Sequence, residues 1–144
     1  MRFLLVDAHS VIFGWPELCA LHRRHAEAAR EQLIARLTAY QDTTGTRVVI
    51  VFDGQGKKNT SEKLPSGVQV FYSASKKTAD DVLERLVAKY AGEHDMTVAS
   101  DDTLVAQTVI TFGGMAISVN SLLEDMERAD AELARQLRNL RKPR

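Results

Sequence analysis

The chain has 144 residues, 44% of them hydrophobic and 26% charged, and its 19 basic and 19 acidic side chains cancel to a formal net charge of zero. This composition is typical of one ordinary globular domain, and the charge balance argues against a protein that coats nucleic acid over its whole surface. With one cysteine and no apolar run long enough to cross a bilayer, residues 1–144 are expected to form a single cytoplasmic domain, a monomer or weak dimer, without a disulfide, a thiolate metal cluster or a membrane partner.

The first predicted element is a buried strand over Phe3–Asp7, which ends on a carboxylate. A turn follows, and Pro16 suits the first position of a short helix. Apolar residues at helical spacing then predict a helix over Ala26–Tyr40, which Gly45 stops. A carboxylate is costly to bury unless polar or charged groups meet it, so the aspartate at the end of this apolar strand is either tolerated at the strand end or has a functional role.

The middle of the chain predicts two further strands and a helix. Arg47–Asp53 is a β-branched run typical of a central parallel strand, and it too ends on an aspartate. Gly54–Gly67 is predicted to be a surface loop, and Val68–Tyr72 a short strand. Thr78 is then expected to cap a helix that runs to about Gly92.

The last third predicts a strand over Thr97–Ser100, a helix over Asp102–Phe112 and a fifth strand over Met115–Val119. Ser121 and Glu124 have the spacing of a capping box at the start of a final helix. The predicted apolar side of that helix carries Leu122, Met126, Ala129, Leu133, Leu137 and Leu140. Its end is basic from about residue 131, which suits either a helix C-terminus or contact with RNA.

Strands that alternate with helices predict an α/β fold with a mostly parallel five-stranded sheet. Ligands of such sheets bind outside the carboxyl ends of the strands. Asp7, Asp53 and the pair Asp101 and Asp102 each follow a predicted strand, so we expect their carboxylates at one edge of the sheet. Of the pair, Asp101 is the preferred site residue, because the residue directly after the strand should point at the edge while Asp102 starts the helix.

The segment TADD adds another carboxylate, and helical geometry separates its two aspartates. Asp80 lies at the edge of the apolar face beside Val87, whereas Asp81 points to the far side with Arg85. Asp80 is therefore the site candidate. Asp81 is expected to serve the helix cap and the helix dipole.

Clustered carboxylates repel one another, and a hard divalent cation is the usual compensation. Mg²⁺ or Mn²⁺ prefers such oxygen ligands and binds substrate phosphates, which suits hydrolysis of a phosphodiester bond. The predicted metal ligands are Asp7, Asp53, Asp80, Asp101 and Asp102.

Basic and aromatic residues near these carboxylates suggest contacts with RNA. The predicted phosphate contacts are Lys57, Lys58, Lys76 and Lys77. His9 either contacts the RNA or fills an aromatic position beside the site. Trp15 either stacks on a base or, as we prefer, packs beneath the first loop.

Four segments, taken in order, resemble the YacP-like branch of the NYN domains, nucleases related to PIN domains. They read LLVDAHSVIFGWPEL, VVIVFDG, KKTADDVLERL and VASDD, and the resemblance spans nearly the whole chain. It implies a PIN-like three-layer sandwich and metal-dependent endoribonuclease activity, with Asp7, Asp53, Asp80 and Asp101 at the acidic positions. It also implies messenger RNA as a substrate and the ribosome as a partner.

The opening motif departs from the family pattern. Where the family has Asp-Gly-Tyr-Asn, this chain has Asp7, Ala8, His9 and Ser10. Ser10 keeps a hydroxyl that can bond Asp7 or a metal-bound water, so it joins the predicted catalytic set. Two hypotheses stay open: an active endoribonuclease, and a non-catalytic RNA-binding or ribosome-docking module with a degenerate site.

Overall fold

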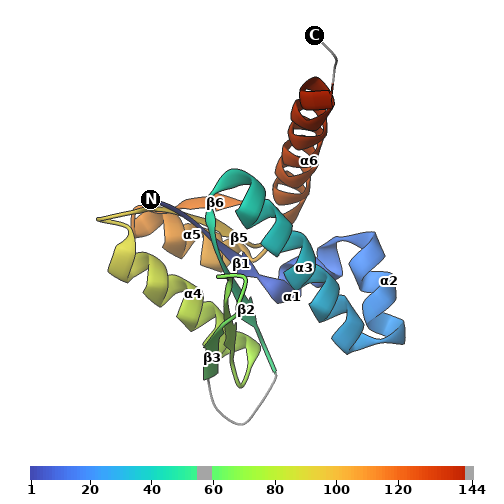
Figure 1. Cartoon of the computed structure of the whole chain (residues 1–144). Coiled ribbons are helices and arrows are strands. Elements are labelled where there is room, and N and C mark those ends of the chain that lie inside the picture. The colour runs from blue at the N-terminus through green and yellow to red at the C-terminus, as the bar shows by residue number, and fades with distance from the viewer. Residues whose placement is uncertain (55–59, 142–144) are drawn as a thin grey trace.

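The computed structural model describes residues 1–54 and 60–141, which form a six-stranded sheet with helices on both faces (Figure 1). The strands are β1 (Arg2–Asp7), β2 (Arg47–Phe52), β3 (Thr60–Lys63), β4 (Gln69–Tyr72), β5 (Asp95–Ala99) and β6 (Met115–Ile117). Their order in the sheet is β3-β4-β2-β1-β5-β6, and every neighbouring pair is parallel except β3 with β4. The predicted α/β sandwich with a mostly parallel sheet is confirmed, with six strands instead of five.

The helices are α1 (Ala8–Gly14), α2 (Pro16–Arg24), α3 (Ala26–Thr44), α4 (Lys76–Tyr90), α5 (Thr103–Thr111) and α6 (Val119–Arg141). Buried side chains of α1, α2, α3 and α6 form a core on one face of the sheet, and those of α4 and α5 form a second core on the other. β1 serves both cores: Leu4 and Val6 belong to the first and Leu5 to the second. A strand covered on both faces needs a continuous apolar run, as the sequence predicts.

The predicted loop over residues 54–67 contains strand β3. Its hairpin with β4 closes where the Leu64 N–H donates to the Val68 carbonyl at 2.9 Å. All four residues of β3 are exposed, so the strand lacks the apolar alternation on which a sequence-based prediction depends. Backbone pairing with β4 alone makes this polar segment a strand.

Helix α1 occupies the place where the sequence predicts a turn. Asp7 is its N-cap, and its Oδ1 accepts from the Ser10 N–H at 3.4 Å. Val11 and Ile12 are buried in the first core and hold the short helix against the sheet. The aspartate that ends β1 therefore also starts the next element.

Two other helices begin earlier than predicted. Ser75 is the N-cap of α4 and forms a capping box with Thr78, so the predicted cap at Thr78 is wrong by three residues. Helix α6 begins at Val119, and the Ser118 hydroxyl accepts from the Ser121 N–H at 3.1 Å, so Ser121 is not its cap. At both sites two hydroxyl residues stand three apart, and the sequence does not distinguish the cap from the third helical residue.

The second half of α6 stands away from the rest of the molecule (Figure 1). Leu122 and Met126 are buried, but Leu133, Leu137 and Leu140 are exposed. The predicted apolar side of this helix is therefore covered only in its first half, because α6 extends beyond the elements it packs on. Among the described residues no helix, α6 included, has the length and apolar character to span a membrane.

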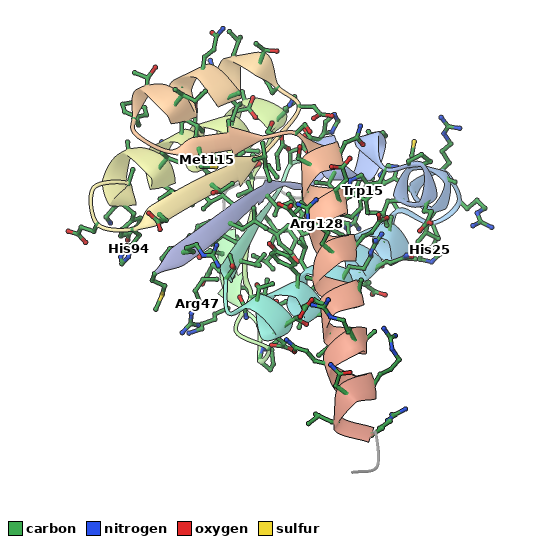
Figure 2. All side chains as sticks on the ribbon, turned by 90° about the horizontal axis from the view of Figure 1, so that it is seen from above. Trp15, His25, Arg47, His94, Met115 and Arg128 are labelled. Carbon is green, nitrogen blue, oxygen red and sulfur yellow. The ribbon has the colours of Figure 1, made fainter. Side chains whose placement is uncertain are left out.

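Trp15 joins α1 and α2 to the start of α6 (Figure 2). Its side chain is 1% exposed, and its Nε1 donates to the Val119 carbonyl at 2.9 Å. Gly14 permits this close approach, since a Cβ there would lie 2.6 Å from the Val119 Cγ2. Trp15 thus packs in the core, as preferred from the sequence, and is not available to stack on a base.

Gln41 links α3 to the sheet from within the protein, where it is 8% exposed. Its Oε1 accepts from the Val48 N–H at 2.9 Å, and its Nε2 donates to the Ser66 carbonyl at 3.2 Å. β2 begins to pair with β4 only at Val49, so β4 provides no acceptor for the Val48 N–H. The Gln41 side chain supplies that acceptor.

We predict that Gln41→Leu lowers the free energy of unfolding by about 1–3 kcal/mol, because it leaves the buried Val48 N–H without an acceptor. Gln107→Leu, the same change at an exposed position of α5, is the matched control and should alter stability by less than about 0.5 kcal/mol. Urea denaturation followed by circular dichroism measures both. Equal losses in the two variants would contradict the role assigned to Gln41.

Candidate active site

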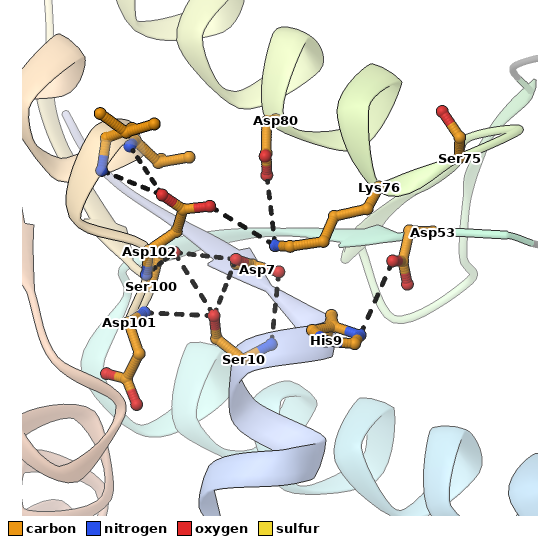
Figure 3. Close-up of polar contacts among 12 residues, drawn as sticks. Asp7, His9, Ser10, Asp53, Ser75, Lys76, Asp80, Ser100, Asp101 and Asp102 are labelled. Carbon is orange, nitrogen blue, oxygen red and sulfur yellow. Dashed lines mark hydrogen bonds and ion pairs between the residues drawn. The ribbon is translucent and has the colours of Figure 1, made fainter.

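The candidate site lies at the carboxyl ends of β1, β2 and β5. β1 is flanked by β2 on one side and β5 on the other, so the strand order reverses at β1. Val6 lies opposite Ala99 in the register, which puts Asp7 beside the residues that follow β5. Crevices at such reversals are where open α/β sheets bind ligands. Figure 3 shows the polar side chains that meet there.

Asp7 is the most deeply buried carboxylate of the site, at 3% exposed. Its Oδ2 accepts from the hydroxyls of Ser10 and Ser100, both at 2.8 Å. These donors replace the water that the carboxylate loses on burial. The bond between Ser10 and Asp7 expected from the sequence is present, and Ser100 adds a second that the sequence analysis missed.

Lys76 lies between the carboxylates of Asp80 and Asp102 (Figure 3). Its Nζ is 3.8 Å from the Asp80 Oδ1 and 3.6 Å from the Asp102 Oδ2. Burial by itself would lower the pKa of Lys76, but the charges of Asp7, Asp80, Asp102 and Asp53 outweigh it and raise the pKa. One ammonium group thus offsets part of the negative charge of carboxylates from four segments of the chain.

Asp80 is the least satisfied member of this group. Burial raises the pKa of its carboxyl to about 6; Lys76 lowers it, while Asp7 and Asp102 raise it further. The Oδ1 is buried and has no hydrogen-bond partner among the described residues, since the Lys76 ammonium stands too far away for one. A cation that bound this oxygen directly would relieve the deficit.

The predicted phase of the helix at TADD is confirmed. Asp80 is partly buried beside the buried Val87, whereas Asp81 is exposed with Arg85 on the opposite side. The capping role predicted for Asp81 is wrong, because α4 starts at Lys76 and has no acidic residue in its first turn.

The structure reverses the orientations predicted for Asp101 and Asp102. Asp102 caps α5 through Oδ1 and faces Lys76 with Oδ2, while Asp101 points away from Lys76 and its Oδ1 accepts from the Val119 N–H at 3.1 Å (Figure 3). The physical reason is that β5 ends at Ala99, one residue before the predicted end. Ser100 therefore takes the position directly after the strand and points at Asp7.

Asp53 lies at the margin of the cluster, next to His9. The His9 Nδ1 is 3.7 Å from the Asp53 Oδ2, and the imidazole is 42% exposed. The negative charge of Asp53 also raises the pKa of Lys76, but less than the charges of the other three carboxylates do. His9 contacts an aromatic ring, that of Phe13, as one of its two predicted roles requires, and its contact with RNA stays a prediction.

A hollow of about 350 Å³ opens beside the cluster, lined by His9, Ser10, Phe13, Gly14, Lys76, Asp101 and Asp102. Asp101 therefore borders the site even though it points away from Lys76. A larger cavity of about 420 Å³ lies elsewhere, against Phe3, Phe71 and Tyr90, and none of the predicted site residues lines it. The smaller hollow is the candidate active site because the charged groups converge there.

Three further lysines were predicted to contact phosphate. Lys57 and Lys58 lie outside the described residues, and Lys77 is exposed beside Lys76. One feature of the sequence could have indicated the central position of Lys76: it stands four residues before Asp80 on one helix. For Ser100, the only indication in the sequence was its position next to two aspartates.

The donor set suits a hard divalent cation. Among residues 1–54 and 60–141, no three His, Cys, Asp or Glu side chains are close enough together, as they stand, to hold one ion. The Lys76 ammonium separates two of the carboxylates, and the buried Asp80 Oδ1 lacks a partner. Oxygen ligands of this kind are those that Mg²⁺ and Mn²⁺ prefer.

Comparisons with known proteins agree with the fold of the chain. The family profile described as "YacP-like NYN domain" matches residues 4–144. Protein YacP of Bacillus subtilis (strain 168) is 31% identical over 146 residues, covering 97% of this chain and 84% of the relative. A crystal structure of Rae1 (YacP) from Bacillus subtilis superposes with a TM-score of 0.77 at 30% identity, covering 97% of this chain and 82% of that chain. A point mutant of Rae1 gives a TM-score of 0.81 at 28% identity, covering 99% and 85%.

We predict that, without metal, Asp80→Asn stabilises the protein at pH 7 and has little effect at pH 4. The raised pKa means that Asp80 favours the folded state below its unfolded pKa and that this contribution is lost as the pH rises through about 6. A pKa difference of this size corresponds to about 3 kcal/mol, and since the side chain is 22% exposed, water reduces the expected gain to about 1–2 kcal/mol.

Urea denaturation in EDTA across this pH range measures the effect. The exposed Asp81→Asn is the control, and its difference from wild type should not grow with pH in this way. A gain for Asp80→Asn that stayed constant from pH 4 to pH 7 would contradict the burial of an unsatisfied carboxyl.

Proposed function

The chain belongs to the YacP-like NYN domain family, whose relatives are PIN-like nucleases, and we propose that it is a metal-dependent endoribonuclease that hydrolyses phosphodiester bonds in RNA. The observation that carries the proposal is the convergence of Asp7, Asp80 and Asp102 on one ammonium at the carboxyl edge of the sheet. Carboxylates in an open hollow repel a phosphate unless a cation stands between them.

Asp7, Asp80 and Asp102 are the proposed ligands of Mg²⁺ or Mn²⁺, with Asp53 and Asp101 at the margins of the same edge. A bound ion of this kind supplies an activated water and neutralises charge on the phosphate. Asp102 is preferred over Asp101 because its Oδ2 faces the cluster, whereas the Asp101 Oδ1 is engaged with the Val119 N–H.

Ser10 and Ser100 are proposed as positioning residues. Both hydroxyls donate to the Asp7 Oδ2, so the carboxylate is held in one orientation. Among residues 1–54 and 60–141, its Oδ1 receives only the long bond from the Ser10 N–H at 3.4 Å. Ligands that are fixed by neighbouring hydrogen bonds bind metal and substrate with less reorganisation.

Lys76, Lys77 and His9 are the proposed RNA contacts among the described residues. Lys76 and His9 are both 42% exposed and line the hollow, so RNA phosphates can reach them from solvent. A phosphate that took the Lys76 ammonium would free Asp80 and Asp102 to bind the cation.

The alternative is an RNA-binding or ribosome-docking module that keeps the fold without cleavage. The departures at Ala8, His9 and Ser10 are the reason to consider it. Ser10, however, still donates to Asp7 at 2.8 Å, so the polar support of that carboxylate is retained. This contact favours the enzyme.

The finer proposal is that the RNA is messenger RNA and that cleavage takes place on the ribosome. It rests on the resemblance of the chain to its family and on the charged hollow beside the carboxylates. Comparing cleavage of free and ribosome-bound messenger RNA by the same preparation tests it.

We predict that Asp80→Asn lowers Mn²⁺-dependent or Mg²⁺-dependent cleavage of labelled RNA by at least about 100-fold, since it removes a charged ligand. Asp81→Asn, the adjacent exposed change, should keep most of the activity. Single-turnover gel assays with and without EDTA measure both. Loss of cleavage in Asp81→Asn but not in Asp80→Asn would place the site on the other side of α4.

We also predict that Mg²⁺ or Mn²⁺ raises the Tm of the wild type but not of Asp7→Asn, because only the intact cluster binds the ion. An ion at 100 times its dissociation constant adds about 2.7 kcal/mol, which corresponds to roughly 5–10 °C for a chain of this length. Thermal denaturation at matched ionic strength measures the shift. Equal shifts in the two proteins would exclude Asp7 as a ligand.

A further inference from the structure

Phe13 is an apolar side chain that the fold leaves in solvent beside the active-site hollow. It is 49% exposed, although Val11 and Ile12, its neighbours in α1, are buried. It lines the hollow together with Lys76 and Asp102. Packing does not account for this position, because the core takes the other apolar residues of the helix and leaves this ring outside.

Two histidines hold the Phe13 ring without covering it. The His9 ring centroid is 4.7 Å away at an interplanar angle of 44°, and the His22 centroid is 5.0 Å away at 64°. Contacts with these two rings restrict the orientation of the Phe13 ring, so it loses little further freedom when a ligand stacks on it. The ring is thus exposed and pre-positioned.

The surroundings of the ring suit a nucleotide chain. His9 leads from Phe13 to Asp53 and the acidic cluster, and His22 lies in the last turn of α2, which also carries Arg23 and Arg24. A chain that crossed Phe13 would meet the carboxylates on one side and basic side chains on the other. The hollow of about 350 Å³ is at the small end of the range for ligand pockets, which suits one nucleotide unit.

We propose that Phe13 is a stacking platform for an unpaired nucleobase next to the scissile phosphate, so that the substrate must be single-stranded at this point. The inference rests on the proposed endoribonuclease function. Both faces of a base inside a duplex are covered by its neighbours, and only an unstacked base can lie on the ring. Stacking of this kind tolerates any base, since each has a π face.

Binding of a labelled single-stranded oligouridylate of about ten nucleotides, within the usual range of single-strand sites, tests the proposal. Fluorescence anisotropy is measured in Mg²⁺ on the Asp80→Asn background. Phe13→Leu should weaken binding about 5- to 150-fold, the loss that corresponds to one stacked base, while Phe13→Trp should bind as tightly as Phe13. Phe112→Leu is the matched control, because Phe112 is 48% exposed at the end of α5 and does not line the hollow.

A ribose-phosphate oligomer of equal length without bases, and an RNA duplex, complete the experiment. Neither should distinguish Phe13→Leu from Phe13. Unchanged oligouridylate binding in Phe13→Leu would overturn the proposal, as would equal losses for the base-free oligomer or an equal effect of Phe112→Leu. Failure of the wild type to cleave RNA with either metal would instead contradict the endoribonuclease function and leave a base-binding site.

Discussion

The burial of the Asp7 carboxylate is the constraint that organises the functional edge of this protein. A carboxylate that is 3% exposed must exchange its water for protein donors, and the donors come from segments far apart in the chain. Ser10 reaches it from α1 and Ser100 from the end of β5, each at 2.8 Å, and the Lys76 ammonium in α4 contributes charge. The elements that surround the site are thus held together by the same groups that satisfy its deepest charge.

One ammonium does not satisfy the whole cluster. Lys76 stands 3.8 Å from Asp80 and 3.6 Å from Asp102, both beyond hydrogen-bond length, and the Asp80 Oδ1 keeps no partner. The pKa of Asp80 is raised because the buried carboxylate is not fully compensated by nearby positive charge. Uncompensated charge of this kind is concentrated at functional sites, where a ligand completes what the protein leaves open. The proposed metal ion is the partner that would complete it, and the phosphate of RNA would then bind to that ion and to the Lys76 ammonium.

Three aspartates of the site also start helices. Asp7 caps α1 and Asp102 caps α5, while Asp101 accepts from the Val119 N–H at the start of α6. In Asp7 and Asp102 one carboxylate oxygen serves the cap, and the other faces the cluster. The positive ends of these helix dipoles therefore point at the edge where negative charge is gathered and lower its cost. The same aspartates cap helices and belong to the site, so residue type alone does not tell which of the two roles an aspartate has.

Local periodicity by itself determined the central strands, the aspartates that follow them and the phase of α4, because each depends on residues within one element. It therefore placed Asp7, Asp53 and Asp80 correctly in the fold. Only the tertiary structure decided that Asp102, not Asp101, faces Lys76 and that residues 60–63 form a strand. Both outcomes depend on where pairing between distant segments begins and ends: β5 stops at Ala99, and β3 exists only because β4 lies beside it. A shift of one residue at a strand end turns the following side chain to another direction, and no local pattern in the sequence carries that information.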